Sequence, residues 1–180
     1  MSGNIRPTSG KVALALFNIL GARGFVDGVS FLDLFSGTGG IALGALERGA
    51  ARVVAVESDR ILAGRISAAM RERNETGIAS CLCGDVRRIV PRLAKENREA
   101  GESDGFDVIF ADPPYCMGWG EELPRLIEAN VSLIAPGGVL VFERSSRERP
   151  ADIIFAHDDR IYGETVLSFY WSETRGEAEI

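Results

Sequence analysis

The sequence predicts an α/β fold in which a mostly parallel sheet carries helices on both faces. Three observations support this prediction. Short apolar runs alternate with segments of helical periodicity over most of the chain, a pattern typical of parallel strands joined by crossover helices. Acidic residues stand at the ends of several of these runs, where ligands bind in such sheets. The last two runs have no helical segment between them, which predicts an antiparallel C-terminal hairpin.

The first predicted element is a helix over residues 12–20, which starts near a Thr or Ser cap and stops at Gly21. Strands of the parallel part are expected over residues 31–35, 52–57, 79–83, 106–111 and 139–142. Helices are expected over residues 41–47 and 121–131. A further helix, capped by Ser58 or Asp59 and ended by Asn74 and Gly77, has its apolar positions within residues 61–70, and another has its apolar positions within residues 86–93. The hairpin strands are expected over residues 152–156 and 165–171.

The connections also have recognisable signals. Residues 95–105 are polar and charged and predict an exposed loop, and Ala135-Pro-Gly-Gly138 predicts a turn before the fifth strand. We find no repeat, low-complexity tract or second domain. Residues 1–180 are therefore expected to form a single domain, of which residues 1–24 are an N-terminal helical segment.

Length and composition limit the classes of protein to which this chain can belong. A chain of 180 residues is long enough for a proper core, and its apolar and charged fractions are those of an ordinary soluble protein. It has no apolar run long enough to cross a bilayer and no signal-peptide pattern at its start, so the cytoplasm is the expected location and no membrane is expected as a partner.

Cysteine and histidine content excludes several chemistries. Cys81, Cys83 and Cys116 form neither a C-x-x-C pair nor an even disulfide set, so reduced thiols are expected. The only histidine is His157, which rules out most histidine-based metal sites and leaves little room for a Ser-His-Asp triad. No metal is therefore expected.

The net charge of −6 counts against a protein that coats nucleic acid without sequence preference. Basic residues nevertheless gather locally. The chain before Asp27 carries basic residues and no acid, and Arg144, Arg147 and Arg149 cluster later. Both a local basic surface and separately solvated arginines are consistent with this pattern.

The stretch Phe31-Leu-Asp-Leu-Phe-Ser-Gly-Thr-Gly-Gly40 predicts a strand, a tight turn and the start of a helix. Its glycines allow a sharp turn and let an anionic group approach the amides of the helix N-terminus. Gly37-x-Gly39-x-x-Ala42 also satisfies the dinucleotide fingerprint, and Glu57 lies near the roughly twenty-residue offset of its ribose acid.

Asp33 separates the two cofactor classes. A carboxylate at this strand end would repel a pyrophosphate, whereas S-adenosylmethionine offers an ammonium for Asp33 and a carboxylate for the turn amides. The charge pattern therefore favours S-adenosylmethionine over NAD. The candidate cofactor-binding residues are Asp33, Phe35, Ser36, Gly37, Gly39, Glu57, Ser58, Asp85 and Val86.

Two acids of this set have specific expected roles. Glu57 can accept hydrogen bonds from two ribose hydroxyls, with a surface ion pair to Arg52 or Arg60 as the alternative. Asp85 can accept from the adenine amino group, and it can also cap the helix that begins at residue 86. Asp59 is assigned to helix capping.

Asp112-Pro-Pro-Tyr115 is the most specific signal in the chain. Two prolines after an acid stiffen the backbone and leave the Asp112 carboxylate and the Pro113 carbonyl as acceptors in a defined geometry. These acceptors can hold the two hydrogens of a base amino group and aim its lone pair at a methyl donor. Tyr115 offers a ring for stacking. The candidate catalytic residues are Asp112, Pro113, Pro114 and Tyr115, and a plain strand-end turn is the alternative.

Together these motifs resemble the RsmD family, whose members methylate the exocyclic N2 of a guanine in small-subunit ribosomal RNA. The resemblance runs from Arg6-Pro-Thr8 through the glycine turn, Val56-Glu57 and Asp112-Pro-Pro-Tyr115 to Pro136-Gly-Gly138. It implies a seven-stranded, Rossmann-like class I methyltransferase sheet and S-adenosylmethionine as donor. It also implies ribosomal RNA, or an assembling small ribosomal subunit, as substrate, with Asp112 and Tyr115 at the target base.

The chain departs from the family pattern near its start. Only Met1 to Ile5 precede the Arg-Pro-Thr motif, where the family usually has a further hairpin thought to help hold RNA. Lys11-Val-Ala-Leu14 stands where Arg-Val-Arg-Glu is typical. The alternatives are amino methylation of DNA adenine or protein glutamine, a donor-binding module without activity, and NAD-dependent reduction.

Overall fold

The computed structural model describes residues 10–73, 77–99, 105–114, 118–149 and 151–173. The strands in these ranges are β1 (Ser30–Leu34), β2 (Arg52–Glu57), β3 (Ala79–Cys83), β4 (Phe106–Ala111), β5 (Ile134–Ser145), β6 (Ala156–Tyr162) and β7 (Thr165–Trp171). The helices are α1 (Gly10–Ala22), α2 (Gly40–Leu46), α3 (Arg60–Arg73), α4 (Val86–Glu99) and α5 (Trp119–Glu128), followed by a short 3₁₀ turn, η1 (Val131–Leu133).

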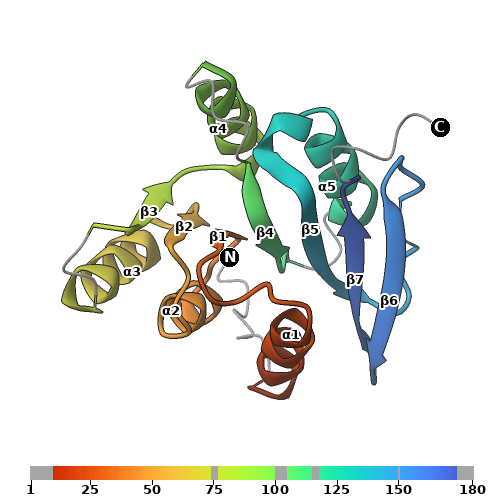
Figure 1. The fold of residues 1–180 in the computed structure, drawn as a ribbon, viewed down its shortest axis with the longest axis horizontal. Helices are drawn as coiled ribbons and strands as arrows, with labels where there is room; N and C mark the ends of the chain where they lie inside the picture. Colours follow the sequence, from red (N-terminus) through yellow and green to blue (C-terminus); the bar gives the residue numbers. More distant parts are fainter. Residues whose placement is uncertain (1–9, 74–76, 100–104, 115–117, 150, 174–180) are drawn as a thin grey trace.

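The strands form one seven-stranded sheet in the order β3-β2-β1-β4-β5-β7-β6. The pairs from β3 to β5 are parallel, and β7 is antiparallel to both β5 and β6. Figure 1 shows the β6–β7 hairpin at one edge of the sheet, with β3 at the other edge. The predicted fold class, including the antiparallel hairpin, is confirmed.

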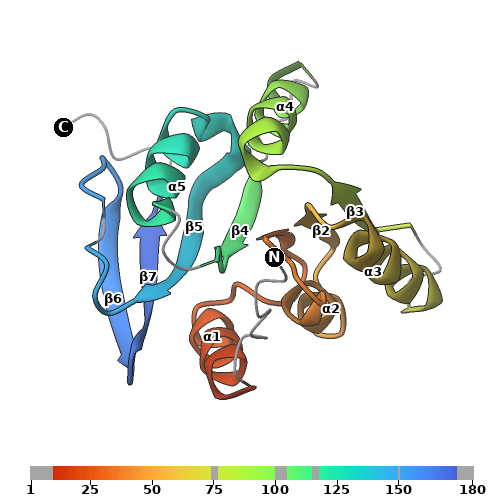
Figure 2. The same cartoon turned by 180° about the vertical axis from the view of Figure 1, so that it is seen from behind.

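Helices cover both faces of the sheet (Figures 1 and 2). Side chains of α1, α2 and α3 pack with one set of strand residues, among them Phe31, Phe110 and Val141. Side chains of α4 and α5 pack with the alternate set, among them Leu32 and Ile109. The central strands β1, β2 and β4 are buried on both faces because parallel sheets are sandwiched between crossover helices, so their sequences read as nearly continuous apolar runs.

Four elements, β6, α4, α5 and β5, differ in extent from the sequence predictions. The hairpin's first strand spans Ala156–Tyr162 rather than residues 152–156. The apolar Ile153 and Phe155, which suggested a strand, instead pack against the core that α4 and α5 cover. The true strand escaped detection because it is a polar edge strand with little alternation of apolar side chains.

Helix α4 continues to Glu99, through residues that the sequence assigned to a loop. Ion pairs one turn apart, Arg92–Glu96 and Lys95–Glu99, support this polar last part. Helix α5 begins at Trp119 and ends at Glu128, earlier at both ends than predicted. The predicted turn at residues 135–138 lies within β5, where the pairing with β4 is interrupted by a register shift.

None of the helices in the described ranges has the length and apolar character needed to span a bilayer.

Candidate functional site

The turn after β1 has an unusual backbone. Phe35, Gly37 and Gly39 all have positive φ, at 63°, 55° and 83°. Two features favour glycine at position 39. Its left-handed backbone disfavours a side chain, and a Cβ there would lie 2.9 Å from Ile66 Cγ1 of α3. The turn brings the N-terminus of α2 to the carboxyl end of β1.

Asp33 lies in β1 beneath this turn and is only 1% exposed. Its Oδ2 accepts a hydrogen bond from the backbone amide of Ala42 in α2, at 3.1 Å. Burial raises the pKa of the Asp33 carboxyl to about 8, and the negative charges of Asp112 and Glu57 add to this shift. The carboxyl is therefore mostly protonated at neutral pH until a positive charge comes beside it.

Ser36 fastens the turn to β2. Its amide donates to the Val56 carbonyl at 2.9 Å, and its hydroxyl accepts from the Val56 amide at 3.1 Å. The same hydroxyl donates to the backbone carbonyl of Asp33 at 2.8 Å. Ser36 thus positions the turn through the backbones of two neighbouring strands.

Glu57 ends β2 and organises the same turn. Its Oε2 accepts from the Gly37 amide at 2.8 Å, and its Oε1 accepts from the Asp59 amide at 2.8 Å and from the Ser58 hydroxyl at 3.3 Å. The Gly37 amide, expected to face a ligand, is therefore engaged by Glu57 in this structure. A carboxylate has about four lone-pair positions, which leaves acceptor capacity for other donors.

Asp85 and Val86 follow β3 at the start of α4. The Asp85 Oδ1 accepts from the Arg87 amide at 2.8 Å, so the predicted capping role is confirmed. Asp59 caps α3 in the same way, through the amides of Ile61 and Leu62. The carboxylate of Asp85 is exposed, whereas Val86 is buried.

Asp112 follows β4 directly and is half-buried, with Pro113 buried and Pro114 exposed. Tyr115 and Cys116 lie outside the described residues. In the parallel pairing, Ala111 is opposite Leu34 on one side and Phe142 on the other. Asp112 therefore stands one position further, between Phe35 of the glycine turn and Glu143 of β5.

The site concentrates negative charge at the carboxyl edge of the sheet. Asp33, Glu57 and Asp112 come from three adjacent strands, and the charges of Asp112 and Glu57 add to the rise in the pKa of Asp33 that burial causes. When ionised, this group of carboxylates would repel a pyrophosphate and attract an ammonium or a sulfonium. The residues present therefore fit S-adenosylmethionine better than a dinucleotide.

Sequence reasoning missed an aromatic contact beside the turn. The Phe35 ring contacts Trp119 of α5 edge-on, with 4.7 Å between ring centroids, and the Arg87 guanidinium lies 4.0 Å from the Trp119 ring centroid. Arg87 also pairs with Glu122, its Nη2 lying 2.7 Å from Oε2. The signal was available, since a tryptophan follows the acid-proline-proline motif closely.

It also missed Glu143, a buried acid in the central strand β5. Glu143 is 4% exposed, and within the described part of the chain its Oε2 has no hydrogen-bond partner. Burial raises the pKa of this carboxyl to about 8, with a smaller contribution from Asp112. The available signal was an acid directly after the apolar run Val139-Leu-Val-Phe142.

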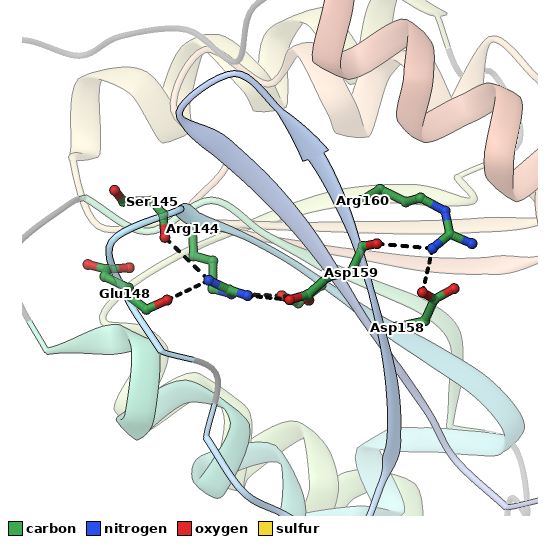
Figure 3. A network of polar contacts seen from close by, with 7 residues as sticks. Arg144, Ser145, Glu148, Asp158, Asp159 and Arg160 are labelled. Atoms are coloured by element: carbon green, nitrogen blue, oxygen red, sulfur yellow. Dashed lines mark hydrogen bonds and ion pairs between the residues drawn. The ribbon is translucent and has the colours of Figure 1, made fainter.

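Arg144, the next residue, has a structural role (Figure 3). Its side chain is 5% exposed and pairs with Asp159 of β6, while its Nε donates to the Ser168 hydroxyl of β7 at 2.8 Å. Its Nη1 donates to the backbone carbonyls of Ser145 and Glu148. Arg144 is therefore not part of a basic surface, which leaves only the exposed Arg147 and Arg149 of that cluster.

The strand order, with acids at the carboxyl ends of β1, β2 and β4, defines the class I methyltransferase fold. The solved "Putative methyltransferase yhhF from Escherichia coli" superposes with a TM-score of 0.76 at 20% identity, over 97% of this chain and 92% of that one. An RNA methyltransferase from Salinibacter ruber in complex with S-adenosyl-L-homocysteine superposes with a TM-score of 0.65 at 18% identity, over 97% and 98% of the two chains.

Residues 1–171 match the family model described as "Conserved hypothetical protein 95". The "Putative rRNA methyltransferase YlbH" of Bacillus subtilis is 30% identical over 169 residues, which cover 92% of this chain and 86% of the relative. The "Ribosomal RNA small subunit methyltransferase D" of Escherichia coli K12 is 29% identical over 182 residues, covering 99% and 85%. The chain belongs to the Conserved hypothetical protein 95 family, that is, the RsmD family, and the predicted resemblance is confirmed.

Proposed function

We propose that this chain transfers a methyl group from S-adenosylmethionine to the exocyclic N2 of a guanine in small-subunit ribosomal RNA. The observation that carries the proposal is the position of Asp112-Pro113-Pro114, one strand away from the glycine turn and two from Glu57. This arrangement brings hydrogen-bond acceptors for an amino group next to a turn suited to a methyl donor.

The cofactor side of the site is assigned as follows. The carboxyl of Asp33 binds the ammonium of the donor, and the turn formed by Phe35, Ser36, Gly37 and Gly39 surrounds its methionine part. Glu57 and Ser58 bind the ribose, and Asp85 and Val86 contact the adenine. S-adenosylmethionine supplies, when bound, an electrophilic methyl group on a sulfonium.

The target side rests on Asp112 and its prolines. The amino group of a base is a poor nucleophile because its lone pair is delocalised into the ring. The Asp112 carboxylate and the Pro113 carbonyl accept its two hydrogens, which directs the lone pair out of the ring plane. The Asp112 carboxylate can also accept the proton that the amine must lose when the methyl group is transferred. Tyr115 is assigned to stacking on the base.

The relatives' names support the choice of substrate. The proteins of Escherichia coli K12 and Bacillus subtilis are named as methyltransferases of small-subunit rRNA and of rRNA, respectively. We assign ribosomal RNA, or the assembling small subunit, to this chain as well. We expect it to act in the cytoplasm, where bacterial ribosomal subunits assemble, and as one domain over residues 1–180.

The test combines a map of the methylated nucleotides with a variant in which Asp112, the proposed acceptor for the target amine, is replaced. Purified protein with labelled donor should methylate one guanine in small-subunit particles or rRNA from cells that lack it, located by mass spectrometry. Replacing Asp112 with Ala should abolish turnover and leave donor affinity near that of the unmodified protein, measured by calorimetry.

Two outcomes would contradict this proposal. Absence of methylation on particles, naked ribosomal RNA and DNA, together with intact donor binding, would identify a binding module without activity. Loss of donor binding in Asp112→Ala would mean that Asp112 serves the cofactor rather than the target amine.

A further inference from the structure

Glu143 is the only acidic residue of β5 and lies deep in the fold. Its Oε2 is buried and lacks a hydrogen-bond partner within the described residues. A buried polar atom without a partner destabilises the folded state, so a site where a ligand supplies the partner is a physical explanation for its presence.

The position of Glu143 places it in the target half of the site. Ala111 of β4 pairs with Phe142 of β5, so Asp112 and Glu143 occupy the next positions on adjacent parallel strands, roughly 5 Å apart in the backbone. Phe142 packs in the layer of α4 and α5, whereas Val141 and Leu167, the residue paired with Glu143, pack in the other layer, so the alternation along β5 places Glu143 on that second face. The effect of Asp112 on the pKa of Glu143 agrees with this proximity.

Resting on the proposed function, we propose that Glu143 is a specificity-determining residue that binds the N1–H and O6 groups of the target guanine beside the amine held by Asp112. Guanine presents an acceptor, O6, followed by two donors, N1–H and N2–H. A protonated carboxyl offers an O–H donor and a carbonyl acceptor, and the Asp112 carboxylate offers a second acceptor. The pair thus copies the donor–acceptor–acceptor edge with which cytosine pairs with guanine.

The protonation state of Glu143 supports this complementarity. Burial, with the nearby charge of Asp112, raises the pKa of Glu143 to about 8, so the group carries a proton at neutral pH. Adenine and cytosine have an unprotonated ring nitrogen beside their amino groups, which would face the carbonyl oxygen of Glu143. The site therefore disfavours these bases although both carry an amine.

The test uses two substitutions of similar size. Glu143→Gln keeps one donor and one acceptor, whereas Glu143→Met removes both and leaves an apolar side chain that suits the buried position. Each variant is assayed on small-subunit rRNA particles that carry guanine or 2-aminopurine at the mapped target. 2-Aminopurine keeps the amino group and lacks both N1–H and O6.

The unmodified protein should methylate guanine about tenfold or more faster than 2-aminopurine, and Glu143→Gln should retain this preference. Glu143→Met should methylate guanine at least about tenfold more slowly and lose the preference, so that both bases react alike. Its donor affinity should be unchanged, and its melting temperature equal or higher, because an unpaired buried carboxyl has been removed.

Guanine methylation by Glu143→Met at the unmodified rate, or a preference for guanine that survives in this variant, would overturn the inference and leave the proposed function intact. A lower melting temperature with the preference retained would show a structural role, which also overturns it. Failure of the unmodified protein to methylate guanine in any particle would instead overturn the proposed function on which the inference rests.

Discussion

Asp33 combines near-complete burial with a carboxyl that keeps its proton at neutral pH. Burial raises its pKa from an ordinary 3.8 to about 8, so the folded state binds a proton that the unfolded state releases between these values. The stabilising effect of that proton is complete below pH 4 and is lost as the pH rises to 8. Asp33 therefore makes the unliganded protein less stable at mildly alkaline pH.

Replacing Asp33 with Asn should remove this dependence, because an amide keeps the acceptor for the Ala42 amide and carries no charge. Compared with the unmodified protein, the variant should gain stability as the pH rises from 5 to 8.5, by on the order of a few kcal/mol. Urea unfolding at the two pH values measures the difference. An equal difference at both pH values would show that Asp33 is already ionised when buried.

The same substitution should weaken donor binding, since the ammonium of the donor would lose its carboxylate. Calorimetric titration with S-adenosylmethionine measures this loss, and an unchanged affinity would contradict the role proposed for Asp33.

The glycine turn connects two elements that must approach closely. Gly39 directly precedes α2 as its N-cap with a φ of 83°, and a Cβ there would lie 2.9 Å from Ile66 Cγ1 of α3. Gly40, its neighbour, has open space around the position of a Cβ and no positive φ. The two glycines therefore offer a matched comparison.

Gly39→Ala should destabilise the protein by about 1–3 kcal/mol, through backbone strain and the contact with Ile66. Gly40→Ala should be neutral or stabilising by up to about 1 kcal/mol, because alanine favours the helix. Thermal or urea unfolding of both variants checks the order. Equal stabilities would mean that α3 moves aside freely and that the close approach of Gly39 to Ile66 does not affect the free energy of unfolding.

At the scale of the whole molecule, Arg144 joins the parallel part of the sheet to the hairpin. It lies in β5, pairs with Asp159 of β6 and donates to Ser168 of β7 (Figure 3). Ser168 in turn donates to Asp159 Oδ1 at 2.6 Å. One buried guanidinium therefore holds three consecutive strands of the sheet edge.

Replacing Arg144 with Met should cost about 2–3 kcal/mol, because Ser168 and Asp159 lose a buried partner. The control is Arg147→Met, whose ion pair with Glu164 is 84% exposed on both sides and should contribute less than about 0.5 kcal/mol. Denaturant unfolding distinguishes the two. A small loss in Arg144→Met would assign the hairpin's stability to its apolar side chains alone.

The sequence was sufficient for the central parallel strands, because they are buried on both faces and read as apolar runs, as in Phe106–Ala111. The acids at the strand ends were also recognisable, because the carboxyl edge is where such sheets place polar side chains. The hairpin's first strand was misplaced, since an exposed edge strand such as Ala156–Tyr162 has no apolar signature.

The partners of individual side chains were beyond reach of sequence patterns. The engagement of the Gly37 amide by Glu57 depends on the register between β1 and β2, which fixes their distance. The edge-on contact of Phe35 with Trp119 likewise joins residues far apart in the chain, and the burial of Glu143 depends on such distant contacts. Such contacts are set by tertiary packing, which the periodicity of a single segment does not encode.

The register of β1, β4 and β5 has a kinetic consequence. Asp33 pairs with Phe110, so it lies two residues further from the carboxyl edge than Asp112. A base seated on Asp112 would cover the route to the inner carboxyl, and we therefore expect compulsory-order kinetics in which donor enters first and demethylated donor departs last. Product inhibition tests this order. S-Adenosylhomocysteine should be a competitive inhibitor towards the donor and not towards RNA. If the substrates entered in random order, methylated RNA would instead compete with unmethylated RNA at every donor concentration.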